Sequence, residues 1–149
     1  MAVDRRLFLQ LHRVNRVVSA HVNRRLLEVL GVSSAQLGTL YHLARQPGCS
    51  ATDLAGALDL NKSAVSTMLQ RLERAGLIAQ TPNPRDARGS CLSLTAKGET
   101  VRTQSVALTR KLQAEITQGF DEAELDTVAR FFGSIIERFG RDSVKGDAE

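Results

Sequence analysis

Small polar side chains gather in the segment 61–71, and their types suit hydrogen bonding to a polyanion. Lys62, Ser63, Ser66, Thr67 and Gln70 recur at helical spacing, so a helix would present them on one face near its start. Hydroxyl and amide groups bond to phosphates and base edges, and the lysine adds positive charge. Because bulky side chains would hold such a helix away, this pattern predicts a helix that enters the major groove of DNA.

A second group of charged residues follows closely, in a stretch that prolines and a glycine exclude from a helix interior. Arg85 and Arg88 stand on either side of Asp86 there. Arginines on a narrow loop suit the minor groove, where the phosphate walls concentrate negative potential. We expect Asp86 to hold an arginine by a charge-assisted pair or to cap the turn, rather than to contact DNA.

Helical patterns precede both groups. Six apolar residues spaced three and four apart predict one long first helix that ends at Gly31: Leu7, Leu11, Val14, Val18, Val22 and Leu26. Ser33 with Gln36 forms a capping box for a second helix that stops before Pro47. A third helix is expected to start at Ser50, with Asp53 three residues later.

The fourth helix carries the polar face described above and needs a buried face opposite it. Val65, Met68, Leu69 and Leu72 supply that stripe, and Gly76 closes the helix. A tight connection at 59–61 makes the third and fourth helices a helix-turn-helix. Short extended runs at 77–81 and 91–94 then predict a β-hairpin with an extended tip between them.

Two further helices are expected after the hairpin. Thr95 caps the fifth, whose apolar stripe runs from Val101 to Ile116, and Asp121 with Glu124 caps the sixth. We expect the sixth helix to turn one set of residues inward: Leu125, Val128, Phe132, Ile135 and Phe139. The predicted fold is therefore mainly α with a small β-hairpin wing, comprising a winged helix-turn-helix lobe and a helical dimerisation lobe.

The composition excludes several protein classes. With 149 residues, 42% hydrophobic and 24% charged, the chain fits one globular domain. It holds no apolar run of about eighteen residues, and its basic, amphipathic start does not resemble a leader, so we expect a cytoplasmic protein. Net charge is +4; the segment 61–90 has five basic and two acidic residues, whereas 100–149 has seven basic and nine acidic.

Cys49 and Cys91 lie far apart with no CxxC spacing and no nearby histidine in the sequence. We therefore expect no metal site, no disulfide and no cofactor, with both cysteines acting as small buried apolar residues. A Gly-rich phosphate loop, HExxH, GxSxG and a catalytic acid–histidine arrangement are all missing from the sequence, which argues against an enzyme.

Two blocks of the sequence resemble the multiple-antibiotic-resistance regulator family, MarR, and the resemblance spans nearly the whole chain. The segment 58–77, with its Asn-Lys-Ser-Ala-Val-Ser-Thr run, resembles the family's recognition helix and its exit into the wing. The segment 83–95 resembles the wing, with Asp-x-Arg, alternating leucines and a threonine that begins the next helix. The two blocks at this separation make a specific signal.

The resemblance implies a sequence-specific DNA-binding transcription regulator, expected to be a repressor. At Thr67 the sequence departs from the family pattern, because many relatives have an arginine or another long polar residue there, so the resemblance does not carry over a base preference. Arg71 is expected near a phosphate, Arg85 and Arg88 on the wing, and Asp86 beside an arginine. Together with the recognition helix, the expected DNA-binding residues are Asn61, Lys62, Ser63, Ser66, Thr67, Gln70, Arg71, Arg85, Asp86 and Arg88.

The resemblance also implies a homodimer on a near-palindromic operator, built from the first helix and the last two. Phe8, Phe131, Phe132, Ile136 and Phe139 exceed what one thin stripe can hide, although they could instead complete a monomeric core. We expect a single MarR-like domain at 1–149. Its DNA-binding lobe would cover about 33–95, its dimerisation lobe about 4–30 and 96–140, and a frayed tail 141–149.

Many relatives are released from DNA by small aromatic or phenolic anions bound between the two lobes. Candidate wall residues here are His12, Arg16, Tyr41 and His42, with structural or surface roles as the alternative. A thiol-based redox sensor is a second hypothesis, with the Cys49 thiolate stabilised by the start of the third helix. A winged-helix module that binds proteins rather than DNA is a third.

Overall fold

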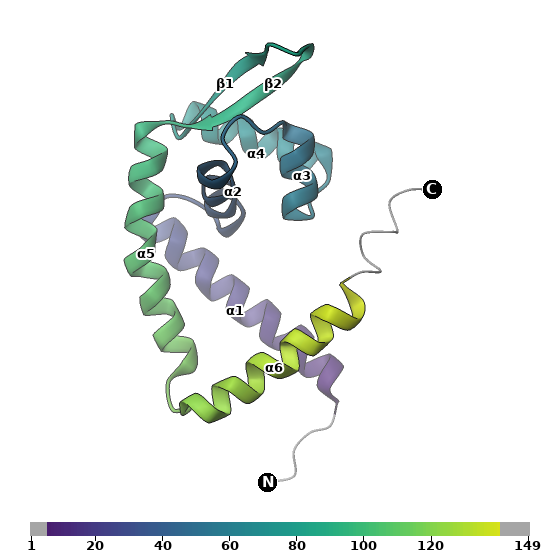
Figure 1. Cartoon of the computed structure of the whole chain (residues 1–149). Helices are drawn as coiled ribbons and strands as arrows, with labels where there is room; N and C mark the ends of the chain where they lie inside the picture. Colours follow the sequence, from purple (N-terminus) through teal and green to yellow (C-terminus); the bar gives the residue numbers. More distant parts are fainter. Residues whose placement is uncertain (1–5, 141–149) are drawn as a thin grey trace. The chain divides into compact units, whose positions relative to one another are not determined.

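The structure of the chain, a computed structural model, describes residues 6–140, with the backbone but not the side chains of 86–88. A hairpin interrupts a series of helices (Figure 1): α1 (Leu7–Leu30), α2 (Ser34–Arg45), α3 (Ala51–Leu58), α4 (Lys62–Arg74), β1 (Ile78–Asn83), β2 (Asp86–Leu94), α5 (Ala96–Thr117) and α6 (Glu122–Phe139). This order confirms the predicted mainly helical fold with a β-hairpin. None of the described helices is long and apolar enough to cross a membrane.

Local signals set the helix ends as predicted. The Ser33 hydroxyl accepts from the backbone N–H of Gln36, and the Gln36 side chain accepts from the Ser33 N–H, which completes the capping box of α2. Equivalent boxes open α3 and α6. Gly31 ends α1 in the left-handed region with φ 69°, a conformation that glycine adopts without a Cβ clash.

The chain divides into two compact units, residues 1–109 and 110–149. The core of the first unit lies among α2, α3, α4 and the base of the hairpin. The whole predicted stripe of α4 is buried there, as are Leu40, Leu43, Leu54 and Leu92. The loop before α3 adds to this core through the backbone, because Gly48 donates to Leu92 and Leu92 donates to Cys49. Burial of these aliphatic side chains removes apolar area from water and stabilises the unit.

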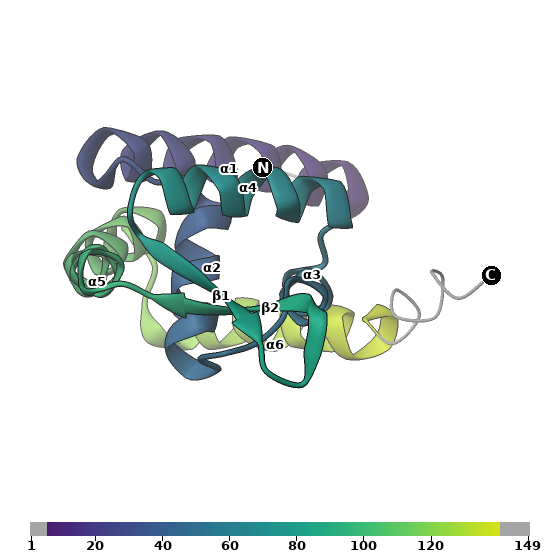
Figure 2. The ribbon, with the colours of Figure 1, turned by 90° about the horizontal axis from the view of Figure 1, so that it is seen from above.

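The hairpin is longer and its tip tighter than predicted. β1 and β2 pair antiparallel from Ile78 with Leu94 to Pro82 with Ser90, then shift register at Asn83. Pro82 lies inside β1 because a two-stranded sheet has only edge strands, where a missing N–H is tolerated. The predicted extended tip was therefore wrong: residues 84 and 85 alone form the turn, and 86–90 continue as strand. In Figure 1 the hairpin projects beyond α2, α3 and α4 of the same unit, and Figure 2 shows it from above, in front of α2 and α3.

Among the described residues, many apolar side chains of α1 and α6 are exposed. Of the predicted inward set of α6, Leu125 and Ile135 are half-buried and the other three residues are exposed, so no residue of α6 is fully buried. Phe139 and Ile136 expose 57% and 69% of their surface, and Phe8 of α1 exposes 80%. Only Leu26 of the predicted α1 stripe is fully buried. Helical periodicity identifies an apolar face but not the molecule that covers it.

Candidate nucleic-acid interface

The turn between α3 and α4 determines where α4 begins. Asp59 adopts the left-handed conformation with φ 52°, which a short acidic side chain tolerates better than most residues. Asn61 then caps α4, since its Oδ1 accepts from the backbone N–H of Ala64 and the hydroxyl of Ser63, both at 2.8 Å. The cap leaves the amide nitrogen of Asn61 as its polar group for an outside partner.

Two faces of α4 differ sharply in polarity. Its apolar face is buried against the core, whereas the predicted contact residues are all exposed: Asn61, Lys62, Ser63, Ser66, Thr67, Gln70 and Arg71. Small side chains dominate the middle of this exposed face. A neighbouring surface could therefore approach the helix closely.

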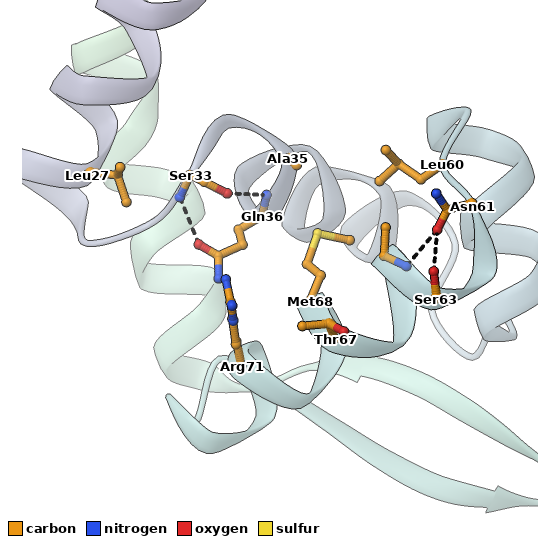
Figure 3. Close-up of a pocket in the computed structure, with 11 residues that line it drawn as sticks. Leu27, Ser33, Ala35, Gln36, Leu60, Asn61, Ser63, Thr67, Met68 and Arg71 are labelled. Atoms are coloured by element: carbon orange, nitrogen blue, oxygen red, sulfur yellow. Dashed lines mark hydrogen bonds between the residues drawn. The ribbon is translucent and has the colours of Figure 1, made fainter.

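A hollow of about 630 Å³ flanks α4 on the side of α2 (Figure 3). From α4 it is lined by Ser63, Thr67 and Arg71, and from the start of α2 by Ser33 and Gln36. In Figure 3 the side chain of Arg71 extends toward Gln36, whose Oε1 already accepts from the Ser33 N–H at 2.8 Å. The residues that line the hollow, all within the described chain, include no carboxylate. The hollow thus offers a guanidinium, an amide and hydroxyls to an anion.

A second hollow of about 300 Å³ flanks the other side of α4. Lys62, Ser66 and Gln70 line it from α4, Thr52 from α3 and Gln80 from β1. The predicted contact residues of α4 are thus divided between two flanks, one toward α2 and the other toward α3 and the wing. Such an arrangement gives the helix polar groups on both sides of its exposed ridge.

The wing tip is capped by a residue whose role the sequence pattern did not predict. The Oδ1 atom of Asn83 accepts from the backbone N–H of Arg85 at 2.9 Å, and Arg85 itself is exposed. An asparagine before Pro-Arg is a turn signal that could have identified this role. The side chains of Asp86 and Arg88 lie outside the described residues, so the predicted pairing of Asp86 with an arginine stays a prediction.

The end of α4 is held by the start of α5, through partners that the sequence did not reveal. Lys97 Nζ donates to the carbonyl of Ala75 at 2.7 Å, and the Thr95 hydroxyl donates to that of Gly76 at 2.6 Å. Thr95 Oγ1 also accepts from the N–H of Gly98. These bonds satisfy carbonyls beyond the last turn of α4, and so they fix the end of α4 against the first turn of α5.

Two of the four predicted ligand residues line a common cavity. Tyr41 and His42 border a space of about 340 Å³ together with Arg45. The Nε2 atom of His42 is buried and has no hydrogen-bond partner within the described chain. His12 and Arg16 are exposed on α1 and are not among the residues that line this space.

Tyr41 is further tied to α5. Its hydroxyl and that of Ser105 share a hydrogen bond at 2.9 Å, and the Arg102 guanidinium lies 5.4 Å from its ring centroid. Ser105 is fully buried, so the bond satisfies a polar group that water cannot reach.

Both cysteines are free and half-buried. Burial raises the pKa of the Cys49 thiol, and the neighbouring Asp53 carboxylate raises it further. The expectation that the start of α3 stabilises a thiolate was therefore wrong, because desolvation and a nearby negative charge oppose ionisation.

Comparison with known proteins finds transcription regulators and a family model. A model described as the MarR family matches residues 30–89. The HTH-type transcriptional repressor Rv2887 of Mycobacterium tuberculosis is 28% identical over 142 residues, which cover 95% of this chain and 99% of that protein. The repressor MdtR of Bacillus subtilis is 32% identical over 99 residues, covering 66% of this chain and 64% of MdtR.

Solved structures agree. The crystal structure of the MarR family transcription regulator SP03579 has a TM-score of 0.77 and 31% identity, and covers 94% of this chain and 93% of its own. A Cys-to-Ser variant of MarR from E. coli, complexed with operator DNA, has a TM-score of 0.75 at 24% identity, and covers 91% and 99%. On this family model and a near full-length structural relative, the chain belongs to the MarR family of transcription regulators.

Proposed function

We propose that this protein regulates transcription by binding duplex DNA, with α4 in the major groove and the wing on the adjacent minor groove. The observation that carries the proposal is the exposed face of α4, which is small, polar and basic, and has a hollow on either flank. Arg85, exposed at the tip of the hairpin that follows, supports the wing's part. The operator complex of the E. coli relative is a property of that protein; here the likeness supports the fold.

The residues of α4 divide by role. Ser66, Thr67 and Gln70 would contact base edges or nearby phosphates, while Lys62 supplies charge. Ser63 and Asn61 are joined by their own hydrogen bond, so they would contribute their remaining polar groups. Arg71, in the hollow beside α2, would contact a phosphate. On the wing, Arg85 and Arg88 would lie along the minor groove, with Asp86 orienting an arginine.

Selection of bound sequences from random duplex DNA tests this function directly. The native chain should enrich one near-palindromic sequence, whose half-sites lie about 10 base pairs apart because two-fold symmetry repeats α4 one helical turn away. The absence of any enriched sequence at low salt would count against the proposal. Two relatives are named as transcriptional repressors, which supports the proposal that binding represses transcription.

The protein is proposed to act as a homodimer, and the uncovered apolar residues of α1 and α6 support this. Exposed apolar patches of this kind mark interaction surfaces in soluble proteins. The helices within about 4–30 and 96–140 would form the dimerisation lobe, and about 33–95 the DNA-binding lobe.

Sedimentation at micromolar concentration tests the dimer. The native chain should sediment as a dimer, and Ile136→Glu should yield monomer because it places a charge on the apolar face of α6. Ser134→Glu, exposed on the same helix away from that face, is the matched control and should remain dimeric. A native monomer would exclude the two-fold model.

A small aromatic or phenolic anion is the proposed effector. The space beside Tyr41, His42 and Arg45 supports a binding site, since it combines an aromatic ring, a cation and an unpartnered imidazole nitrogen. A ligand that prefers the state unfit for DNA by about 1–3 kcal/mol would weaken operator binding roughly 5- to 150-fold.

Titration of salicylate into the complex of the protein with the selected duplex checks the effector. Salicylate should release the DNA from the native protein but not from His42→Ala, and Arg16→Ala tests whether the predicted residue of α1 takes part. Reductant should be present throughout the salicylate titration, and peroxide should be tested in a separate series without it. If peroxide instead of salicylate releases the DNA, and Cys49→Ser prevents that release, the redox alternative replaces this proposal. Binding of a protein partner without any DNA binding would favour the third alternative.

A further inference from the structure

Gln80 of β1 joins the recognition helix to the wing through both ends of its amide. Its Nε2 donates to Glu73 Oε2 in the last turn of α4 at 3.3 Å, and its Oε1 accepts from the Ser90 hydroxyl of β2 at 3.2 Å. The strand register pairs Gln80 with Leu92, so Ser90 is its diagonal neighbour nearer the tip. One side chain thereby touches α4 and both strands.

This bridge lies at the corner where helix and wing diverge. Gln80 also lines the hollow formed with Lys62, Ser66 and Gln70, the flank of α4 that faces α3 and the wing. The backbone holds the base of the hairpin because Leu77 donates to Leu72, and it holds β2 as far as the level of Gln80 because Leu92 pairs with the loop before α3. Through Ser90, the Gln80 side chain extends this restraint two residues further along β2 toward the tip, and through Glu73 it adds the link from β1 to α4.

An isolated two-stranded hairpin is marginally stable and bends easily in water. The wing and α4 can reinforce one another on DNA only if their relative angle matches the separation of neighbouring grooves. If the angle does not match, binding of one element does not place the other at its groove, and the complex loses the entropy of ordering it. We propose that Gln80 is a positioning residue, which holds the wing at the angle to α4 that lets both engage together. This inference rests on the proposed DNA binding.

Exchanging the side chains of Glu73 and Gln80 gives the sharpest test. In Gln80→Glu, two carboxylates face each other and the bridge breaks. In the double variant Glu73→Gln with Gln80→Glu, an amide again meets a carboxylate, Ser90 can still donate, and the net charge equals that of the native chain. Thr81→Ala is the matched control, since Thr81 is exposed and adjacent on the same strand.

The probe is the duplex selected from random DNA by the native protein, and the readouts are equilibrium affinity and hydroxyl-radical footprinting. Gln80→Ala should bind about five- to tenfold more weakly, as expected for a lost hydrogen-bond bridge. Protection should fall at the wing's nucleotides and persist at those covered by α4. Gln80→Glu should bind the duplex at least as weakly as Gln80→Ala does. The affinity of the double variant should recover to within about twofold of the native value, and Thr81→Ala should bind with native affinity.

The inference fails if the double variant remains as weak as Gln80→Glu, or if Gln80→Ala loses both footprints equally. Native affinity in Gln80→Ala would also overturn it while leaving the proposed function intact, whereas a native protein that selects no duplex would overturn the function itself. Should Gln80→Ala unfold, Ser90→Ala removes the other half of the bridge and must show the same selective loss at the wing.

Discussion

At the scale of single residues, Gly98 lies where the first turn of α5 packs directly against the backbone of Leu77, the residue before β1. A Cβ at this position would overlap the carbonyl oxygen of Leu77. That carbonyl cannot move freely, because it accepts from the N–H of Thr95 at 3.2 Å. Glycine is required here for space rather than for an unusual backbone conformation.

Gly98→Ala should lower the free energy of unfolding by about 2–4 kcal/mol, since backbone must move to admit the methyl group. Gly56→Ala in α3 is the control, because a Cβ there meets nothing within 4 Å, and helix propensity should make it neutral or up to about 1 kcal/mol more stable. Urea unfolding of both variants checks this. Equal effects would show that the contact at Leu77 is easily relieved.

Asp53 links the stability of the α3 cap to pH. Hydrogen bonds from the Ser50 hydroxyl at 2.7 Å and backbone N–H at 2.9 Å hold the pKa of its carboxyl below its ordinary value of 3.8. A depressed folded-state pKa adds stability above the ordinary value, and this stability is lost as pH falls through the lower value. Asp53→Asn should therefore be less stable than native at pH 7, by a margin that shrinks below pH 4.

Unfolding in urea at several pH values between about 3 and 7 measures that margin. A margin that stays constant over the range would show that ionisation of Asp53 does not contribute to the cap.

Residues differ in how far the sequence could predict them. The capping pairs at 33 and 36, 50 and 53, and 121 and 124 were predicted because both partners lie within one turn. The partners of Gln80, Lys97 and Tyr41 were not, since they lie 7 to 64 positions away and only the fold brings them together. The thiolate hypothesis for Cys49 was wrong because burial and the Asp53 carboxylate raise the pKa of its thiol, and burial could not be read from the sequence.

At the scale of elements, α4 and the wing were predictable to different degrees. The α4 stripe combines periodicity with a cap and a closing glycine, and each signal is local. The wing's length was misjudged because proline suggested a break, although an edge strand accepts it. The proposed contributions of the two elements to binding differ as well: α4 would make specific contacts and the wing would supply charge.

Variants of the two elements should separate these contributions. Ser66→Leu should abolish preference for the selected duplex, because a bulky side chain on the exposed face holds α4 out of the groove. Arg85→Ala should weaken binding to all sequences alike and lower the salt slope by about one. Arg110→Ala removes the same charge from an exposed site on α5 and is the control. Titration by fluorescence anisotropy measures all three; loss of sequence preference in Arg85→Ala would contradict this division.

At the scale of the whole molecule, the exposed apolar residues of α1 and α6 are the principal difference between the described structure and the predicted packing. Amphipathic spacing predicted both helices and their apolar sides, but it cannot distinguish burial within one chain from burial against a second. The exposure of residues such as Phe139 and Ile136 shifts the expectation toward a partner chain. Two copies of α4 and the wing would then meet one duplex.

The salt dependence of binding by the native dimer tests the central claim most directly. Affinity for the selected duplex should be measured between 50 and 200 mM salt, with the stoichiometry of the complex determined by sedimentation. Two protomers per duplex that together contact roughly six to ten phosphates should lose about three to five decades of affinity over that range. An affinity that does not change with salt, or a complex with a single protomer, would contradict the account.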